Sequence, residues 1–290
     1  MVVIRIGTRG SALALVQARI VAAMLGREAV AKLVVVRTAG DASDRPIREL
    51  ADGAFVATLE DALRRGEVDV AVHSLKDLPT AESEDCTIAA IPPREDPRDV
   101  MVTATRGGLG SLPQGARVGT SSPRRGAFLL AIRPDVHLID IRGNVDTRLR
   151  KVREGEVDAT ILAVAGLRRL GIPVASQEIL STDVLLPAPG QGALAVQCRS
   201  DDRVMRDRLA GLDDLHARIA VTAERALLRD LGASCELALG ALATFDDGTV
   251  TLDAALALDG KRARVRTSAT DPREAARLAV EALGGVPHAV

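Results

Sequence analysis

The chain of 290 residues has no tryptophan, no tyrosine and only three phenylalanines. Proteins that hold single-stranded nucleic acid stack its bases on aromatic side chains, so this scarcity argues against that role. The net charge of −1 argues against it too, because a general polyanion binder carries a surplus of basic residues. Nucleic acid is therefore not an expected partner.

Cysteine is also scarce. The three cysteines, Cys86, Cys198 and Cys235, are odd in number, lie far apart and form no C-x-x-C pair. Neither a disulfide framework nor a zinc knuckle fits that spacing. His73 has no second histidine or cysteine at ligand spacing, so we predict no metal site.

Long hydrophobic runs are missing. The most apolar stretch, Ala159–Leu167, is far shorter than the roughly 18 residues that a membrane-spanning helix needs. The N-terminal Met-Val-Val-Ile-Arg-Ile favours a strand and lacks the basic segment and cleavage site of a signal peptide. We expect a cytoplasmic protein that binds no membrane and, since no segment suggests an interface, a monomer.

The remaining composition is that of a globular protein, with 47% hydrophobic and 27% charged residues. The length predicts two or three domains. Predicted strands and helices alternate over roughly the first 200 residues, which favours an α/β fold. The predicted strands are Val2–Ile6, Leu33–Arg37, Val68–Val72, Thr87–Ile91, Val100–Thr103, Arg117–Gly119, His137–Ile141, Ala159–Leu162 and Ala193–Cys198. The predicted helices are one that Ser11 caps, Phe55–Arg65, Arg124–Ile132 and Val145–Arg153.

A sequence echo indicates two lobes of similar topology. Arg65-Gly66-Glu67-Val68-Asp69 recurs as Arg153-Glu154-Gly155-Glu156-Val157-Asp158, each time just before a predicted strand. Ala193–Cys198 could return to the first lobe after the Pro187–Gly192 segment. We therefore predict a first lobe of residues 1–92 with 193–211 and a second lobe of residues 98–187.

From residue 214 to residue 290 the pattern changes to a small α+β domain. A helix over Leu215–Leu231 precedes three predicted strands, and Pro272–Leu283 is an amphipathic helix. The strands are Leu237–Phe245, Val250–Leu258 and Arg262–Thr267, joined by hairpin turns at Asp247-Gly248 and Asp259-Gly260.

Basic residues follow the predicted strands, where helices begin. Arg9 lies in the first strand-to-helix loop, Arg124 and Arg125 follow Thr120-Ser121-Ser122, and Arg142 and Arg148 flank the next helix start. Arginine beside the free N–H groups of a helix N-terminus is a strong anion site. The alternative is that these arginines are solvated surface residues. Their repeated placement between a predicted strand and a helix start favours a site for a polyanionic small ligand.

Two further segments are candidates for chemistry. His73-Ser74-Leu75-Lys76-Asp77 follows a strand, where Asp77 could exchange a proton or stabilise a cation, or could simply cap a turn. Cys235 lies on a loop of small residues and could be a nucleophile or an attachment point, although a structural cysteine fits equally.

These residues resemble the porphobilinogen deaminase (hydroxymethylbilane synthase) family over essentially the whole chain. The motifs occur in the family's order, and nine of them in register make the resemblance specific. They are Gly7-Thr8-Arg9-x-Ser11, Thr38-x-Gly40-Asp41, His73-Ser74-x-Lys76-Asp77-x-Pro79, Arg94-Glu95-Asp96-Pro97-Arg98-Asp99, Gly119-Thr120-Ser121-Ser122-x-Arg124-Arg125, Arg142-Gly143-Asn144-Val145-x-Thr147-Arg148, Ala163-Val164-Ala165-Gly166-Leu167-x-Arg169, Pro189-Gly190-Gln191-Gly192 and Glu224-Arg225.

The resemblance implies two similar α/β lobes, like those of periplasmic binding proteins, and a C-terminal α+β domain with a three-stranded antiparallel sheet. It implies a transferase that joins four porphobilinogens head to tail with loss of ammonia and releases hydroxymethylbilane by hydrolysis. Its cofactor would be a dipyrromethane, held by Cys235 through a thioether. Asp77 would stabilise positive charge and pass protons.

The resemblance also assigns binding residues. Cofactor contacts would come from Ser74, Lys76, Asp77, Thr120, Ser121, Ser122, Arg124, Arg125 and Gly143. Substrate contacts would come from Arg9, Ser11, Arg142, Arg148, Arg169 and Gln191.

Two loops depart from the family's pattern. Ala51-Asp52-Gly53-Ala54 lacks the usual lysine, and Ser234-Cys235-Glu236 replaces the usual Gly-Cys pair. The alternative function is therefore a non-catalytic protein, a degenerate paralogue, that binds an anionic small ligand.

Overall fold

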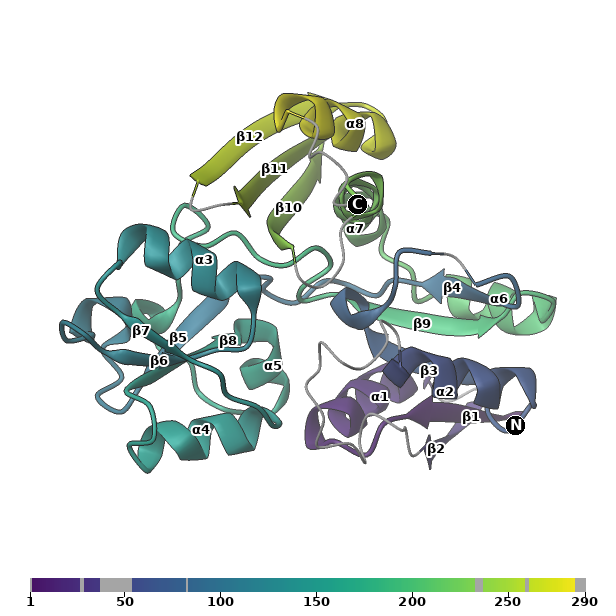
Figure 1. Ribbon diagram of the computed structural model, residues 1–290. Coiled ribbons are helices and arrows are strands. Elements are labelled where there is room, and N and C mark those ends of the chain that lie inside the picture. The colour runs from purple at the N-terminus through teal and green to yellow at the C-terminus, as the bar shows by residue number, and fades with distance from the viewer. Residues whose placement is uncertain are drawn as a thin grey trace. The chain divides into compact units, whose positions relative to one another are not determined.

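The computed structural model describes residues 2–26, 29–36, 54–81, 83–232, 237–258 and 261–284 (Figure 1). The chain divides into two compact units. The first contains Met1–Arg94 and Ala193–Arg218, and the second contains Glu95–Gly192 and Ile219–Val290. Within the described residues, no helix is long and apolar enough to cross a membrane.

The first unit is built on a five-stranded sheet of order β2-β1-β3-β9-β4. β1 runs parallel to β2 and β3, whereas β9 runs antiparallel to both β3 and β4. β9 confirms the predicted return of the chain to the first lobe. The strands are β1 (Val2–Thr8), β2 (Ala29–Val35), β3 (Val70–Ser74), β4 (Cys86–Ala90) and β9 (Leu194–Arg199), and the helices are α1 (Ala12–Met24), α2 (Ala54–Arg64) and α6 (Arg203–Ala210).

The core of this sheet follows from strand alternation. Ile4 and Ile6 of β1 are fully buried and belong to one cluster with Val70 of β3 and with Ala18 and Val21 of α1. Removal of such side chains from water drives their packing, at about 25 cal/mol for each Å² of apolar surface. Ser11 begins α1 by accepting a hydrogen bond from the amide of Ala14, as predicted.

The second unit contains a four-stranded sheet of order β5-β8-β6-β7. β6, β7 and β8 are parallel, and β5 is antiparallel to β8. The elements are β5 (Asp99–Thr103), β6 (Arg117–Gly119), β7 (His137–Ile139), β8 (Ala159–Ala163), α3 (Pro123–Ile132), α4 (Val145–Arg153) and α5 (Val164–Arg169), with short 3₁₀ turns η4 (Gly108–Ser111) and η5 (Ser176–Glu178).

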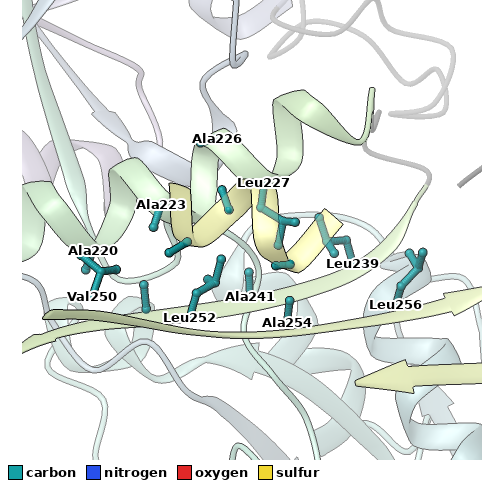
Figure 2. Close-up of a cluster of buried hydrophobic side chains, with 14 residues drawn as sticks. Ala220, Ala223, Ala226, Leu227, Leu239, Ala241, Val250, Leu252, Ala254 and Leu256 are labelled. Carbon is teal, nitrogen blue, oxygen red and sulfur yellow. The ribbon is translucent and has the colours of Figure 1, made fainter. Parts of the chain in front are cut away.

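A three-stranded antiparallel sheet, with α7 (Leu215–Asp230) and α8 (Pro272–Ala282), completes the described fold. Its strands are β10 (Ala238–Asp246), β11 (Thr249–Leu258) and β12 (Lys261–Ala269). Figure 2 shows the buried side chains of this sheet, such as Leu239 and Leu252, lying against Ala223 and Leu227 of α7. The predicted α/β fold and the predicted antiparallel sheet are both confirmed.

The sequence echo corresponds to a hydrogen-bonded arginine–aspartate clamp that occurs once in each α/β sheet. Asp69, just before β3, accepts hydrogen bonds from the backbone N–H and the guanidinium of Arg5 on β1. Asp158, just before β8, accepts the same set from Arg117 on β6. The two clamps join equivalent pairs of parallel strands, so the two α/β sheets share this local topology.

Most predicted elements lie within two residues of their observed bounds, but β2 does not. It occupies Ala29–Val35 and not Leu33–Arg37, because its pairing with β1 runs from Val2 opposite Ala29 to Thr8 opposite Val35. Sequence patterns missed α5 and α6, which are short. The predicted turn at Asp259-Gly260 and the loop around Asp52-Gly53 lie outside the described residues.

Candidate functional site

In the first unit, candidate side chains follow two neighbouring parallel strands. Arg9 and Ser11 come directly after β1, and Lys76 and Asp77 come directly after β3. Because β1 and β3 are parallel, their carboxyl ends meet at one edge of the sheet. The structure therefore brings these predicted residues to the same edge.

The turn that holds Asp77 is well anchored although its polar side chains are exposed. The 3₁₀ turn η3 (Leu75–Asp77) buries Leu75, and Leu78 after it is also buried. The amide of Leu75 donates to the carbonyl of Ala193 at 3.0 Å, and that of Leu78 donates to Leu75 at 3.1 Å. Apolar anchors on both sides thus fix a backbone on which the Asp77 carboxylate is open to solvent.

Glutamine side chains of α1 and β9 form hydrogen bonds to Ser74 and His73. Gln17 of α1 is buried, and its Nε2 donates to Ser74 Oγ at 2.8 Å. Nε2 of His73 lies 3.1 Å from Oε1 of Gln197, whose own Nε2 donates to Glu60 at 2.7 Å. Since the Gln197 oxygen accepts, His73 carries its proton on Nε2.

His73 stays neutral over a wide pH range. Burial lowers the pKa of His73 to about 4, the bond to Gln197 opposes that shift, and the charge of Arg9 adds to it. A neutral, buried imidazole next to Ser74 fits a supporting role better than a proton-transfer role.

In the second unit, candidate residues again follow parallel strands. Thr120, Ser121 and Ser122 come after β6, and Ser122 Oγ accepts the amide of Arg125 at the start of α3. Ser121 Oγ donates to the carbonyl of Ile141 in the loop after β7. The loops after β6 and β7 are therefore tied together at one edge of the sheet.

Arg124 and Arg125 of α3 are both buried around one carboxylate, Asp99, which has no exposed surface. Asp99 Oδ1 accepts Nη2 of Arg125 at 2.7 Å, and Oδ2 lies 2.8 Å from Nη1 of Arg124. Burial alone raises the pKa of Asp99, but the two guanidiniums outweigh it and lower the pKa to about 2. Burial lowers the pKa of Arg124, which the charge of Asp99 opposes. Two cations thus share one anion, and positive charge remains.

Arg142, Gly143 and Arg148 surround the start of α4. Gly143 has a φ of 102°, and a Cβ there would lie 2.7 Å from Thr147. Its carbonyl accepts Nε of Arg148 at 2.9 Å, and Arg142 lies 3.8 Å from Asp140. Burial, followed by the charge of Arg125, lowers the pKa of Arg148. This cluster adds to the positive charge near the start of α3.

Arg169 is the last residue of α5, and Gln191 lies on the segment that precedes β9. Arg169 Nη2 donates to the carbonyl of Gly192 at 2.6 Å, and burial lowers the pKa of Arg169 although Glu95 opposes that shift. Gln191 is almost fully buried and donates to Pro97 and Asp99 at 2.7 and 3.0 Å. Both side chains fasten this segment within the second unit.

Sequence patterns missed four supporting residues. Gln17, Asp99, Gln197 and Glu224 are buried polar groups, and Glu224 accepts amides of Gly190 and Ala243 at 2.7 and 2.9 Å. Asp99 and Glu224 stand in motifs that the sequence singled out, so motif membership was an available signal. The two glutamines had none.

Two predicted features cannot be placed. Cys235 and the Thr38-x-Gly40-Asp41 motif lie outside the described residues. Cys86 and Cys198 are buried free thiols. Among the residues that the structure describes, no group of three histidine, cysteine or acidic residues could hold a metal ion.

The chemistry of the two edges is that of carboxylate binding. Arginine forks, a lysine, serine hydroxyls and helix starts are all hydrogen-bond donors suited to carboxylates. A carboxylate of the protein, Asp77, accompanies the donors in the first unit. Each edge by itself suits a ligand that carries carboxylates, and the exposed carboxylate in the first unit suits a centre that becomes positively charged.

Comparisons with known proteins agree with these chemical features. Residues 4–207 match a family model for "Porphobilinogen deaminase, dipyromethane cofactor binding domain", and residues 218–284 match one for its C-terminal domain. A porphobilinogen deaminase of Nocardia farcinica is 47% identical over 95% of this chain and 83% of the relative. One of a Roseiflexus species is 50% identical over 92% of this chain and 91% of the relative.

Among solved structures, a putative methionine-binding lipoprotein of Bacillus subtilis is similar with a TM-score of 0.45 and 14% identity. The match covers 73% of this chain and 91% of that one.

Proposed function

This chain belongs to the porphobilinogen deaminase family, transferases that make hydroxymethylbilane for tetrapyrrole biosynthesis, and we propose how its own residues carry out that reaction. The observation that carries the proposal is the surplus of buried positive charge around Asp99. Charge of this kind is costly in a protein interior unless an anion neutralises it.

The residues present fit a dipyrromethane cofactor, whose pyrroles carry acetate and propionate groups. When bound, this group supplies the pyrrole carbon to which new units are joined. We assign its attachment to the thiol of Cys235. Its carboxylates are bound by Ser74, Lys76, Thr120, Ser121, Ser122, Arg124, Arg125 and Gly143.

Substrate carboxylates are assigned to a second set of donors. Guanidinium groups pair with carboxylates in a bidentate manner, so arginines at the strand ends orient porphobilinogen and the growing chain. The set is Arg9, Ser11, Arg142, Arg148, Arg169 and Gln191. In this proposal, the bonds that Arg148 and Arg169 make to backbone carbonyls hold their guanidiniums in place.

Asp77 is the proposed catalytic residue. Loss of ammonia from porphobilinogen leaves positive charge on the pyrrole, and an open carboxylate stabilises that charge and accepts hydrogen bonds from pyrrole N–H groups. The same carboxylate passes protons during deamination and coupling. The anchored turn between Leu75 and Leu78 supports this role, because it fixes the backbone that carries the carboxylate.

We further propose that the enzyme acts as a cytoplasmic monomer with three domains, residues 1–92 with 193–211, residues 98–187 and residues 214–290. One matched family model ends at residue 207 and the other begins at residue 218, which supports a boundary before the third domain. Light scattering after size exclusion would test the monomer.

The experiment that tests the cofactor assignment is an intact mass of the purified protein. We expect an excess of two pyrrole units, absent from Cys235→Ser and retained in Cys198→Ser, which makes the same exchange at a buried thiol. A wild type that stays unmodified after incubation with porphobilinogen would favour the non-catalytic paralogue. Loss of the excess in Cys198→Ser alone would overturn the choice of cysteine.

A further inference from the structure

No residue of the Arg94–Asp99 motif is assigned above to cofactor binding, substrate binding or catalysis, yet its last residue lies at the centre of the basic cluster of the second unit. We propose that Asp99 is a positioning residue for cofactor attachment. It fixes the guanidinium of Arg125. Through Arg124 it also fixes the Leu186–Pro187 segment against which β10 packs. The inference rests on the proposed function, because the anion that would neutralise this basic cluster is a carboxylate of the proposed cofactor.

Asp99 determines which edge of the Arg125 guanidinium is available. Its Oδ1 accepts both Nε and Nη2 of Arg125, at 3.1 and 2.7 Å, and also Nε2 of Gln191 at 3.0 Å. Within the part of the chain that the structure describes, Nη1 of Arg125 makes no hydrogen bond. A guanidinium held along one edge presents the other edge in a fixed direction, which suits an incoming carboxylate.

Through Arg124, Asp99 also reaches the C-terminal sheet. Nη1 of Arg124 lies 2.8 Å from Asp99 Oδ2 and donates to the carbonyl of Leu186. The next carbonyl, that of Pro187, accepts the amide of Ala241 in β10 at 2.8 Å. β10 begins three residues after Cys235, so the same carboxylate braces the arginine cluster and the strand that follows the proposed attachment point.

The charge balance explains why a carboxylate is needed at this position. With Asp99 present, Arg124 and Arg125 leave one net positive charge for a ligand to neutralise. Without it, the two buried guanidiniums repel each other, and that of Arg125 loses its orientation, because nothing else described on this edge holds its Nε edge. At metal sites, loss of a residue that orients a ligand side chain costs about 10- to 100-fold in affinity or activity, and we take the lower end of that range as the scale expected here.

The test measures attachment itself. Full-length protein is produced in a host that makes no porphobilinogen, porphobilinogen is then added, and the intact mass is followed over time. We expect Asp99→Asn, which removes the charge, to acquire the two-pyrrole excess at least about tenfold more slowly than the wild type. Asp99→Glu keeps the charge but displaces the carboxylate, and we expect it to be slowed in the same direction.

The matched control is Glu178→Gln. Glu178 is a buried carboxylate of the same unit, on η5, and its side chain binds Arg106 at 3.1 Å and the amide of Ala175 at 2.9 Å rather than the arginine cluster. It should lower the melting temperature but leave the attachment rate unchanged. Equal slowing in this control would make the effect one of general stability and overturn the proposal.

The outcomes separate the two proposals. Attachment at the wild-type rate in Asp99→Glu overturns the positioning role, and this variant decides the matter if Asp99→Asn does not fold. A wild type that gains no mass overturns the proposed cofactor chemistry instead.

Discussion

Asp77 and Asp99 show that the same residue type can have opposite roles, depending on whether its carboxylate is exposed or buried. Asp77 is exposed on an anchored turn, whereas Asp99 is completely buried between two guanidiniums. An open carboxylate can exchange protons and meet a substrate, while the buried one is kept ionised by its partners. Local sequence alone does not separate these roles, since both residues follow a basic residue in a polar motif.

Replacement of Asp77 should abolish turnover without unfolding the protein. In Asp77→Asn the amide keeps the size of the side chain but removes the charge, so we expect hydroxymethylbilane formation to fall by at least about 100-fold. The melting temperature should change little, because Leu75 and Leu78 still anchor the turn. Asp207→Asn, at an exposed position of α6, is the control. Undiminished turnover in Asp77→Asn would exclude the catalytic role.

The lowered pKa of His73 predicts that the stability of the folded protein depends on pH. Its pKa is about 4 in the folded protein, where burial outweighs the bond to Gln197, and 6.5 is its ordinary value. The unfolded chain therefore binds a proton between pH 6.5 and 4 that the folded protein does not. Stability from the neutral imidazole is complete above pH 6.5 and is lost as the pH falls towards 4, by roughly 3 kcal/mol in all.

Urea unfolding of the wild type and of His73→Gln at several pH values between 7 and 4 measures this contribution. The difference between the two unfolding free energies should shrink as the pH falls, since the variant has no imidazole to protonate. A difference that stays constant over this range would show that His73 is not the group responsible.

At the scale of elements, the repeated Arg–Asp clamp explains why a short sequence echo marks two similar sheets. Arg5 with Asp69, and Arg117 with Asp158, each join a strand to the residue just before its parallel neighbour. Parallel strands are joined by long crossovers and not by tight turns, so a side-chain clamp at the strand start helps to fix their pairing.

Asp69→Asn and Asp158→Asn should each destabilise the fold by about 1 to 2 kcal/mol, because each removes a charged acceptor of several hydrogen bonds. The loss should be larger for Asp69, whose side chain is 18% exposed against 35% for Asp158. The control Asp201→Asn changes an ion-paired side chain that is 87% exposed and should change the unfolding free energy by less than about 0.5 kcal/mol. Chemical denaturation decides among these values.

At the scale of the whole molecule, the C-terminal sheet is part of the second unit's core. Ala255 of β11 is buried in one cluster with Phe128 of α3 and with Leu186. Gly240 of β10 permits this approach, since a Cβ there would lie 2.7 Å from the Leu186 side chain and 2.9 Å from its carbonyl. The helix that carries Arg124 and Arg125 is therefore packed against the strand that follows Cys235.

Gly240→Ala should destabilise the protein by about 2 kcal/mol through overpacking. Gly211→Ala is the matched control, because a Cβ there meets nothing closer than 3.9 Å and its φ of −67° suits alanine. Far-ultraviolet circular dichroism follows both melting curves, as the chain has no tryptophan or tyrosine to report unfolding by fluorescence. Equal melting temperatures for the two variants would contradict the close packing.

The sequence by itself determined the order of the strands and of most helices, the cap at Ser11, and the positions of Arg9, Asp77 and Arg125 after strands. These features depend on neighbours within one or two helical turns, so their pattern is visible in the chain. The family likeness added roles for these residues, which local patterns alone left open.

Only the tertiary structure decided which buried groups hold the candidate residues. Gln17 meets Ser74 and Asp99 meets Gln191 across 57 and 92 residues, and no local pattern encodes such a pair. Burial then sets their energetics, because a charge or an amide removed from water must find its partner inside the fold. For that reason the sequence located the residues at the strand ends, while the fold determined how they are oriented.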